Sequence, residues 1–162
     1  MRHPKKSSLA VLLCCVVLSN WRLPQGFSQE KVSSKELVAQ SWEALFKKDY
    51  VLLEKLVKQC VHENGKEADA QQASLHGFPS QDKIGTYQAL NDVATCLFVR
   101  IEAFVREEKR DDAKEACREL IKKYPFAQAW DPRGWYWKVA EKAQATLDKL
   151  EKGISAIEES RK

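Results

Sequence analysis

The chain has 162 residues, with 27 lysines and arginines against 23 aspartates and glutamates. Four of these basic residues and none of the acidic ones lie in residues 1–28, so the remainder carries 23 of each sign. No basic run interleaved with aromatic residues follows, which argues against a nucleic-acid partner or an anionic membrane surface. Residues 29–153 are long enough for one domain with a modest core.

Residues 1–28 have the composition of a secretory signal peptide. A basic stretch, 2–6, precedes an apolar run, 9–18, that is half the length of a membrane-spanning helix of roughly twenty residues. Small residues favour cleavage after Ser28, and cleavage after Ser19 stays open as an alternative. We therefore expect an exported protein, secreted or periplasmic, with no integral membrane span after cleavage.

Cysteines within the apolar run raise the alternative of a lipid anchor. A lipoprotein needs a small residue directly before the modified cysteine, and Leu13 precedes Cys14. We therefore expect no lipid anchor.

Residues 34–63 predict the first of two antiparallel helix pairs. Ser33 and Glu36 form a capping-box pattern at its start, and Asp49 is placed to cap the second helix. Apolar residues recur at helical spacing along one face of each helix: Leu37, Val38, Trp42, Leu45, Leu53, Leu56, Val57, Cys60 and Val61.

Residues 64–84 are predicted to be an insertion between the two pairs. Gly65 is expected to end the preceding helix. Residues 66–75 predict a short helix from their composition, and residues 76–80 predict a break. A long helix is then expected to begin near residue 86.

Residues 86–124 predict the second helix pair. Asp111 is the expected cap of its second helix. Pro125 is expected to end that helix, because proline lacks an N–H group and biases Tyr124 toward an extended conformation. The apolar face of the second helix consists of Ala113, Ala116, Cys117, Leu120, Ile121 and Tyr124.

The two pairs repeat each other at a spacing of sixty residues. Leu53 and Leu56 shift onto Ala113 and Ala116, and further apolar positions of the first pair have counterparts at the same distance. Repetition of helix pairs is typical of solenoid proteins, in which neighbouring pairs bury a shared core.

The second pair resembles a tetratricopeptide repeat. Ala113 matches the small residue that this family has after the turn, and Pro125 matches its terminal proline, whereas Ile101 replaces the usual glycine. The apolar positions of the family are occupied by Phe104, Cys117 and Leu120. The resemblance covers about residues 34–151. It implies an all-α fold of antiparallel helix pairs stacked as a short solenoid, with a helical surface that binds a protein or peptide.

Residues 132–152 predict a C-terminal capping helix. Asp131 is its expected N-cap and Pro132 its first residue, where the missing N–H is harmless. The apolar seam of this helix is Tyr136, Ala140, Ala143, Leu147 and Leu150. The helix is expected to end at Gly153, before a tail of residues 154–162, and to cover the exposed face of the second pair.

Trp130, Arg133, Trp135 and Trp137 are the candidate partner-binding residues. Two interpretations of this cluster stay open. The rings pack against neighbouring aromatic residues and anchor the capping helix, or they form a partly exposed shelf beside the arginine. Such a shelf could stack on sugar rings or hold an apolar peptide side chain.

Three cysteines follow the signal peptide: Cys60, Cys96 and Cys117. In the repeat arrangement that the resemblance implies, Cys96 and Cys117 lie on facing helices, so a disulfide between them is one alternative in an oxidising compartment. The other is that all three are small buried hydrophobic residues.

The sequence offers little for catalysis. It has no glycine-rich phosphate loop, nucleophile elbow or CxxC motif. His62 and Glu63 begin like a zinc-protease motif, but Lys66 occupies the position of the second histidine. A metal site formed by His62, Glu63, Glu67 and Asp69 is less favoured than a solvated helix end. We expect no enzymatic activity, cofactor or metal.

The leading hypothesis is a non-enzymatic adaptor or scaffold of the periplasm or cell envelope that binds a protein or peptide through its helical surface. The alternative is a glycan- or cell-wall-binding accessory module that uses Trp130, Trp135 and Trp137. The sequence does not identify the partner or the oligomeric state.

Overall fold

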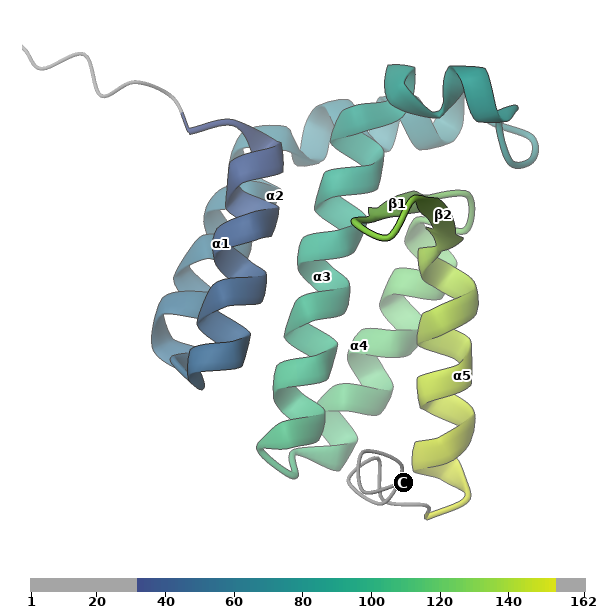
Figure 1. Cartoon of the computed structure of the whole chain (residues 1–162). Coiled ribbons are helices and arrows are strands. Elements are labelled where there is room, and N and C mark those ends of the chain that lie inside the picture. Colours follow the sequence, from purple (N-terminus) through teal and green to yellow (C-terminus); the bar gives the residue numbers. More distant parts are fainter. Residues whose placement is uncertain (1–31, 154–162) are drawn as a thin grey trace, which may run out of the picture. The chain divides into compact units, whose positions relative to one another are not determined.

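The computed structural model describes residues 32–153, and this part of the chain is mostly helical, as predicted (Figure 1). The α-helices are α1 (Ser34–Lys47), α2 (Tyr50–Ala73), α3 (Gln88–Arg106), α4 (Arg110–Lys123) and α5 (Val139–Glu151). A 3₁₀ helix, η1 (Gln81–Tyr87), precedes α3, and the strands β1 (Gln128–Asp131) and β2 (Trp135–Lys138) form an antiparallel hairpin between α4 and α5. The expected signal peptide, its cleavage sites and the tail lie outside the described residues.

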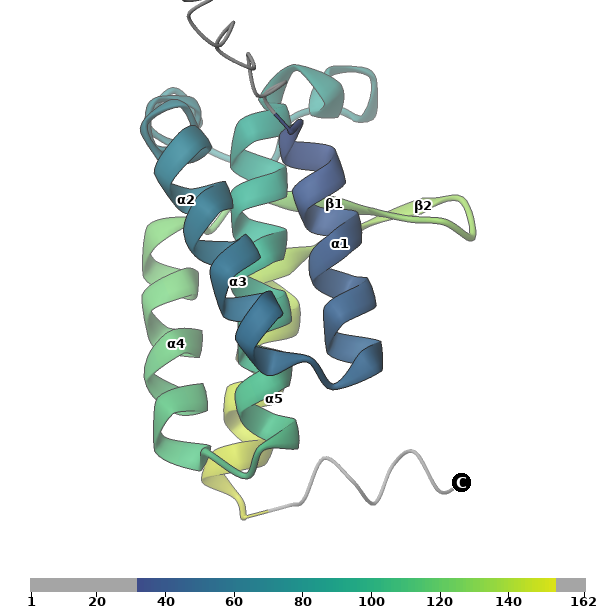
Figure 2. The same ribbon diagram turned by 90° about the vertical axis from the view of Figure 1, so that its left-hand side faces the viewer.

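Helix α3 is the central element of the described part. It packs on α1, α2, α4 and α5. In addition, α1 packs on α2, and α4 packs on α5. Figure 2 shows α3 between α2 and α4 on one side and α1 and the hairpin on the other. One hydrophobic cluster joins buried residues from all five helices. The helices are therefore held together by a single core.

The turn between α1 and α2 has the same backbone geometry as the turn between α3 and α4. Lys48 and Glu108, sixty positions apart, both adopt the left-handed conformation, with φ of 59° and 60°. Residues other than glycine seldom take this conformation. The next residues, Asp49 and Lys109, each donate their backbone N–H to a carbonyl five residues earlier, at 2.9 Å in both turns. The two turns that the predicted sixty-residue repeat makes equivalent therefore share one backbone geometry.

The predicted caps of the first pair are confirmed. Ser33 Oγ accepts a hydrogen bond from the backbone N–H of Glu36 at 3.2 Å. Asp49 Oδ1 accepts one from the backbone N–H of Leu52 at 3.0 Å. Each carboxylate or hydroxyl thus satisfies an amide that the first helical turn leaves free.

The predicted cap of α4, Asp111, is wrong. Helix α4 begins at Arg110, so the capping position falls on Lys109, whose side chain makes no capping hydrogen bond. Asp111 lies in the first turn of the helix, and its side chain is fully exposed. The repeated turn geometry fixes where the helix begins, and at that place the second pair has a lysine where the first has Asp49.

The predicted end of α2 at Gly65 is also wrong, and residues 66–75 form no separate helix. Helix α2 continues to Ala73. Gly65 and Ala68 are buried on its inner face. The side-chain amide of Asn64 donates to the carbonyl of Cys60 at 3.1 Å, within the helix. Burial of this face outweighs the helix penalty of glycine, which is about 1 kcal/mol.

The predicted capping helix over residues 132–152 is wrong in its first third, residues 132–138, where the chain forms the hairpin. The carbonyl of Asp131 accepts from the backbone N–H of Gly134 at 2.9 Å, which closes a tight turn around Pro132. Gly134 has a φ of 107°, a conformation suited to glycine. Asp131 is consequently the last residue of β1 and not a helix N-cap.

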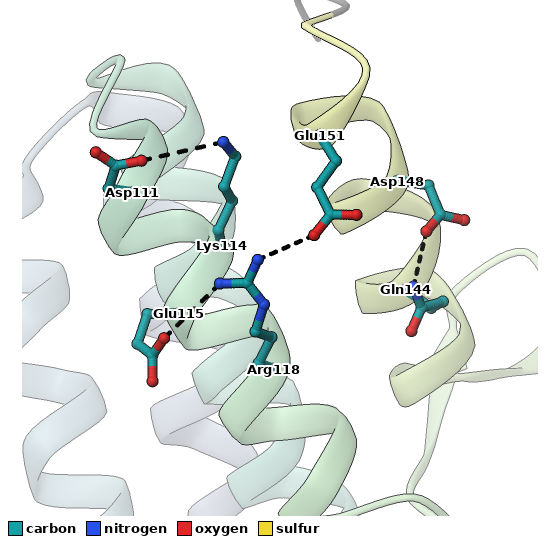
Figure 3. A network of polar contacts seen from close by, with 7 residues as sticks. All are labelled: Asp111, Lys114, Glu115, Arg118, Gln144, Asp148 and Glu151. Atoms are coloured by element: carbon teal, nitrogen blue, oxygen red, sulfur yellow. Dashed lines mark hydrogen bonds and ion pairs between the residues drawn. The ribbon is translucent and has the colours of Figure 1, made fainter.

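The apolar seam predicted for the capping helix is confirmed for the residues that lie in α5. Tyr136 belongs to β2, whereas Ala140, Ala143, Leu147 and Leu150 are buried on α5. An exposed ion pair between Arg118 of α4 and Glu151 of α5, at 2.9 Å, closes the far end of this contact (Figure 3). Exposed pairs of this kind contribute about 0–1 kcal/mol, so the apolar seam accounts for most of the docking of α5.

The three cysteines of the described part are buried free thiols, and the bridge suggested between Cys96 and Cys117 is absent. Cys96 instead meets Cys60, across the contact of α3 with α2. The hydrogen bond between the two thiols and their burial raise the pKa of Cys96. Burial and the nearby Glu102 raise the pKa of Cys117 to about 12. Cys96 and Cys117 therefore remain protonated at neutral pH.

Candidate functional site

The hairpin brings the four candidate residues onto one short element. Its register places Trp130 opposite Tyr136 and Asp131 opposite Trp135. Residues that face each other across a sheet share a side of it. The rings of Trp130 and Tyr136 meet edge to face, with centroids 5.0 Å apart. Trp130 is 55% exposed, so this pair forms an accessible aromatic surface.

Arg133 is engaged within the hairpin turn. Its Nε and Nη2 atoms each donate to the carboxylate of Asp131 at 2.9 Å, and its guanidinium carbon lies 4.4 Å from the ring centroid of Trp135. These contacts, led by the side-chain hydrogen bond from Arg133, lower the pKa of Asp131 to about 2. Arg133 therefore shields one face of Trp135, which is 44% exposed, and already has a carboxylate partner.

Trp137 is directed toward the helices and not toward solvent. Its ring packs edge to face on Phe98 of α3, with centroids 5.3 Å apart. It is half-buried and belongs to the hydrophobic cluster. Of the two interpretations of the aromatic residues, anchoring describes Trp137, and an exposed surface describes Trp130 and Trp135.

A cleft of about 670 Å³ lies between the hairpin, α1, η1 and α3, and we call it the hairpin cleft. Its volume is in the range of pockets that hold small ligands or a few residues of a peptide. The aromatic residues that line it are Trp42, Trp130, Tyr136 and Trp137. The polar residues that line it are Lys35, Gln88, Asn91, Asp92, Thr95, Gln128 and Asp131. Trp135 and Arg133 line an adjoining cleft of about 730 Å³ on the α5 side of the hairpin. The two clefts share Trp42, Asp131, Tyr136 and Trp137, but Trp130 lines only the hairpin cleft and Trp135 only the adjoining one.

The polar part of the hairpin cleft contains a buried amide with unused hydrogen-bonding capacity. Gln128 is only 9% exposed. Its backbone N–H donates to Asn91 Oδ1 at 2.8 Å, which fixes the start of β1 on α3. Its side-chain Nε2 is buried and has no hydrogen-bond partner in the structure. A buried donor without a partner costs about 1–3 kcal/mol, and a ligand in the cleft could satisfy it.

Asp92 is the ionisable group on the same side of the cleft. Its Oδ2 accepts from the hydroxyl of Ser34 at 2.6 Å. Burial raises its pKa, against the lowering effect of hydrogen bonds from Ser34 and Gln88. The cleft thus combines an amide donor and a hydrogen-bonded carboxyl group with aromatic walls.

Sequence reasoning identified the hairpin residues but missed the other wall of the cleft. Trp42 was assigned only to the apolar face of its helix. Asn91, Asp92 and Gln128 carry no motif, because only the packing of the hairpin on α3 brings them together. The alternation of Trp130, Tyr136 and their neighbours around an Asp-Pro-Arg-Gly turn was a usable signal for the hairpin.

The three acidic residues considered for a metal site, Glu63, Glu67 and Asp69, accept hydrogen bonds from other side chains. Glu63 accepts from Gln59, and Asp69 accepts from the hydroxyl of Tyr124 at 2.7 Å. Within residues 32–153, no group of three or more histidine, cysteine, aspartate or glutamate side chains is placed to hold a metal ion. Among the helices of the same range, none combines the length and apolarity needed to cross a membrane.

The chain was compared with protein-family models, curated proteins and solved structures, and nothing in any of the three comparisons matches it.

Proposed function

We propose that this protein is a non-enzymatic adaptor of the cell envelope that binds an extended peptide segment of a partner protein in the hairpin cleft. The observation that carries this proposal is the unpartnered, nine-tenths buried Gln128 amide beside the aromatic walls of the cleft. A peptide supplies a backbone carbonyl for such a donor and apolar side chains for the rings of Trp42 and Trp130.

A tetratricopeptide-like arrangement of the helices is part of this proposal. It is supported by the sixty-residue repeat, in which α1–α2 and α3–α4 are equivalent pairs with the same turn. It is also supported by the packing of α5 on the second pair. In this arrangement α1 and α3, the first helices of the two pairs, border the hairpin cleft. Helix α5 is the capping helix, and the hairpin occupies the place of its expected first turns.

A glycan is the second candidate ligand, and one observation favours it. Planar polar side chains, those of Asn91, Asp92 and Gln128, lie in the same cleft as the exposed indole of Trp130. Sugar rings stack their apolar face on aromatic residues while their hydroxyl groups bond to amides and carboxylates.

The test is selection of a displayed random-peptide library on purified protein comprising residues 29–162, followed by calorimetry with the selected peptides. Trp130→Ala removes a wall of the hairpin cleft, and Trp135→Ala is the matched control, because Trp135 is similarly exposed but lines the other cleft. We expect affinity to fall by at least tenfold in Trp130→Ala and to change little in Trp135→Ala.

Two results would decide against the peptide adaptor. The first is that no peptide is enriched while soluble wall oligosaccharides quench the fluorescence of the wild type but not of Trp130→Ala, which would establish the glycan module. The second is that the selected peptides bind both variants equally, which would place their site elsewhere.

A further inference from the structure

A groove of about 800 Å³ lies between α2 and α4, and residues of α3 form its floor. We call it the α2–α4 groove. In Figure 2, α2 and α4 lie on the opposite side of α3 from the hairpin and α1. The groove shares no lining residue with the hairpin cleft, so an inference about it does not rest on the proposed function.

Positive charge predominates along the α2–α4 groove. The cationic residues that line it are Lys58, Arg100, Lys122 and Lys123, and the acidic one is Glu119. Lys58 and Lys123 form ion pairs with carboxylates of α2, at 3.4 and 3.1 Å. Within residues 32–153, Arg100 and Lys122 form no ion pair. The groove therefore offers two cations without a carboxylate partner.

Arg100 differs from the other arginines of the described part in being partly buried rather than exposed. Its Nε is buried and has no hydrogen-bond partner. Its guanidinium carbon lies 6.0 Å from the ring centroid of Phe104. By contrast, the exposed Arg118 and Arg133 both have carboxylate partners at 2.9 Å. A buried guanidinium N–H that lacks an acceptor is costly, which favours an anion as its missing partner.

The α2–α4 groove also has apolar lining residues. Val61 of α2, Leu97 of α3 and Leu120 of α4 line it together with Arg100. A small inorganic anion would leave this surface uncovered. A peptide that carries an acidic side chain next to an apolar one would use both parts of the groove.

We propose that the α2–α4 groove binds an acidic peptide segment of a partner protein, with a carboxylate on Arg100 and an adjacent apolar side chain on Val61 and Leu97. The planar fork of a guanidinium matches a carboxylate with two parallel hydrogen bonds, and Lys122 supplies additional attraction at the rim. The single negative charge of a carboxylate suits a rim that also carries Glu119 better than the double charge of a phosphate. The protein would then hold two partners, one on each side of α3.

The experiment uses a pool of fluorescent peptides in which glutamate alternates with random apolar residues, and a second pool with glutamine in place of glutamate. Binding to the protein comprising residues 29–162 is measured by anisotropy. Arg100→Gln tests the site, and Arg110→Gln is the matched control, because Arg110 is an exposed arginine outside the groove. We expect affinity for the glutamate pool to fall at least tenfold in Arg100→Gln and less than twofold in Arg110→Gln. The glutamine pool should not bind.

A site-specific reading comes from the Nε–Hε resonance of Arg100 in an NMR spectrum, which should shift on addition of the acidic peptides. Lys122→Gln is a second variant for the case that Arg100→Gln does not fold, with an expected loss of threefold or more. Equal losses in Arg100→Gln and Arg110→Gln would overturn the proposal in favour of attraction by net charge. Three further results would overturn the proposal as well. The two pools could bind equally, or the glutamate pool could fail to bind. Inorganic phosphate at an equimolar concentration could also displace the peptides completely.

Discussion

Gly65 lies inside α2 and is buried, yet the space beside it can hold a methyl group. A Cβ atom at this position would lie 3.6 Å from Val61 Cγ1, an ordinary van der Waals distance. Alanine loses less backbone entropy than glycine when a helix forms. We therefore expect Gly65→Ala to raise the free energy of unfolding by about 0.5–1 kcal/mol.

Urea denaturation measures this change. Gly77→Ala is the control, because a Cβ there would meet nothing within 4 Å and the residue lies in a bend outside the helices. A lower midpoint for Gly65→Ala than for the wild type would contradict the view that α2 runs through residue 65 as one continuous helix.

Asp92 should make stability depend on pH in the direction opposite to that of most aspartates. Burial raises its pKa in the folded protein, so the folded state binds its proton more readily than the unfolded state does. Its ionisation therefore destabilises the fold above the folded pKa. This penalty disappears as the pH falls through the folded pKa to the unfolded value of about 3.9.

Asp92→Asn removes this penalty and keeps an acceptor for the hydroxyl of Ser34. We expect the variant to be more stable than the wild type at pH 7, and the difference to shrink to zero near pH 3. Thermal unfolding of both proteins across this range provides the measurement. If the variant is instead less stable than the wild type at pH 7 and this deficit disappears as the pH falls, the carboxylate of Asp92 is stabilised in the folded state.

At the scale of elements, the repeat offers a direct comparison of two helix starts. Asp49 and Lys109 occupy equivalent positions, with φ and ψ of −86° and 76° against −79° and 68°. The aspartate caps its helix, whereas the lysine leaves the first amides of α4 without a side-chain acceptor. Lys109→Asn should supply this acceptor and stabilise the protein by about 1 kcal/mol.

Asparagine is preferred over aspartate here because Asp111 and Asp112 already lie in the first turn of α4. Lys109→Ala is the control, since it removes the exposed ion pair with Glu107 and supplies no cap. If Lys109→Asn is no more stable than Lys109→Ala in denaturant titrations, the two turns are not equivalent in solution.

The sequence predicted helices best where one face is apolar over several turns. It predicted α1, α3 and α4 because each has such a face. The sequence-based prediction failed where the same residue type is compatible with two different local structures. Gly65 was taken for a helix end, and its burial inside α2 is a tertiary effect. Asp131 and Pro132 suit a helix start as well as a tight turn, and the strand-forming residues after Gly134 favour the turn.

The candidate site was predictable only in part, for a related reason. Trp130, Trp135 and Trp137 are conspicuous because three tryptophans lie close together in the sequence. Alternation along the strands, which a helical interpretation hides, puts Trp130 on one face of the hairpin and Trp135 and Trp137 on the other. The last two differ because Trp137 packs on Phe98 of α3, whereas Trp135 contacts Arg133 in the turn. Gln128 and Arg100 are ordinary residues in the sequence. Each gains interest only through its buried, unpartnered nitrogen atom in the folded protein.

At the scale of the molecule, the two repeated pairs should not behave as separate folding units. Helix α3 packs on α1 and α2 as well as on α4 and α5, and buried residues of all five helices belong to one cluster. Separating the pairs would expose both sides of α3 to water. Because the loss of apolar burial would exceed what either pair could recover alone, we expect one cooperative unfolding transition.

Tryptophan fluorescence can test this cooperativity at both ends of the fold. The experiment uses the protein comprising residues 29–162, which lacks Trp21. With Trp130, Trp135 and Trp137 changed to phenylalanine, only Trp42 remains and reports on α1, whereas Trp42→Phe reports on the hairpin. Each variant is also followed by circular dichroism, so its own stability change is taken into account. We expect the fluorescence and dichroism midpoints to coincide within each variant.

If the fluorescence of Trp42 changes at a lower urea concentration than the dichroism of the same protein, α1–α2 unfolds first and the pairs are independent. Coincidence in both variants would instead mean that the hairpin cleft and the α2–α4 groove are built on one cooperative unit, so that a peptide bound at either site should raise the midpoint reported from both ends.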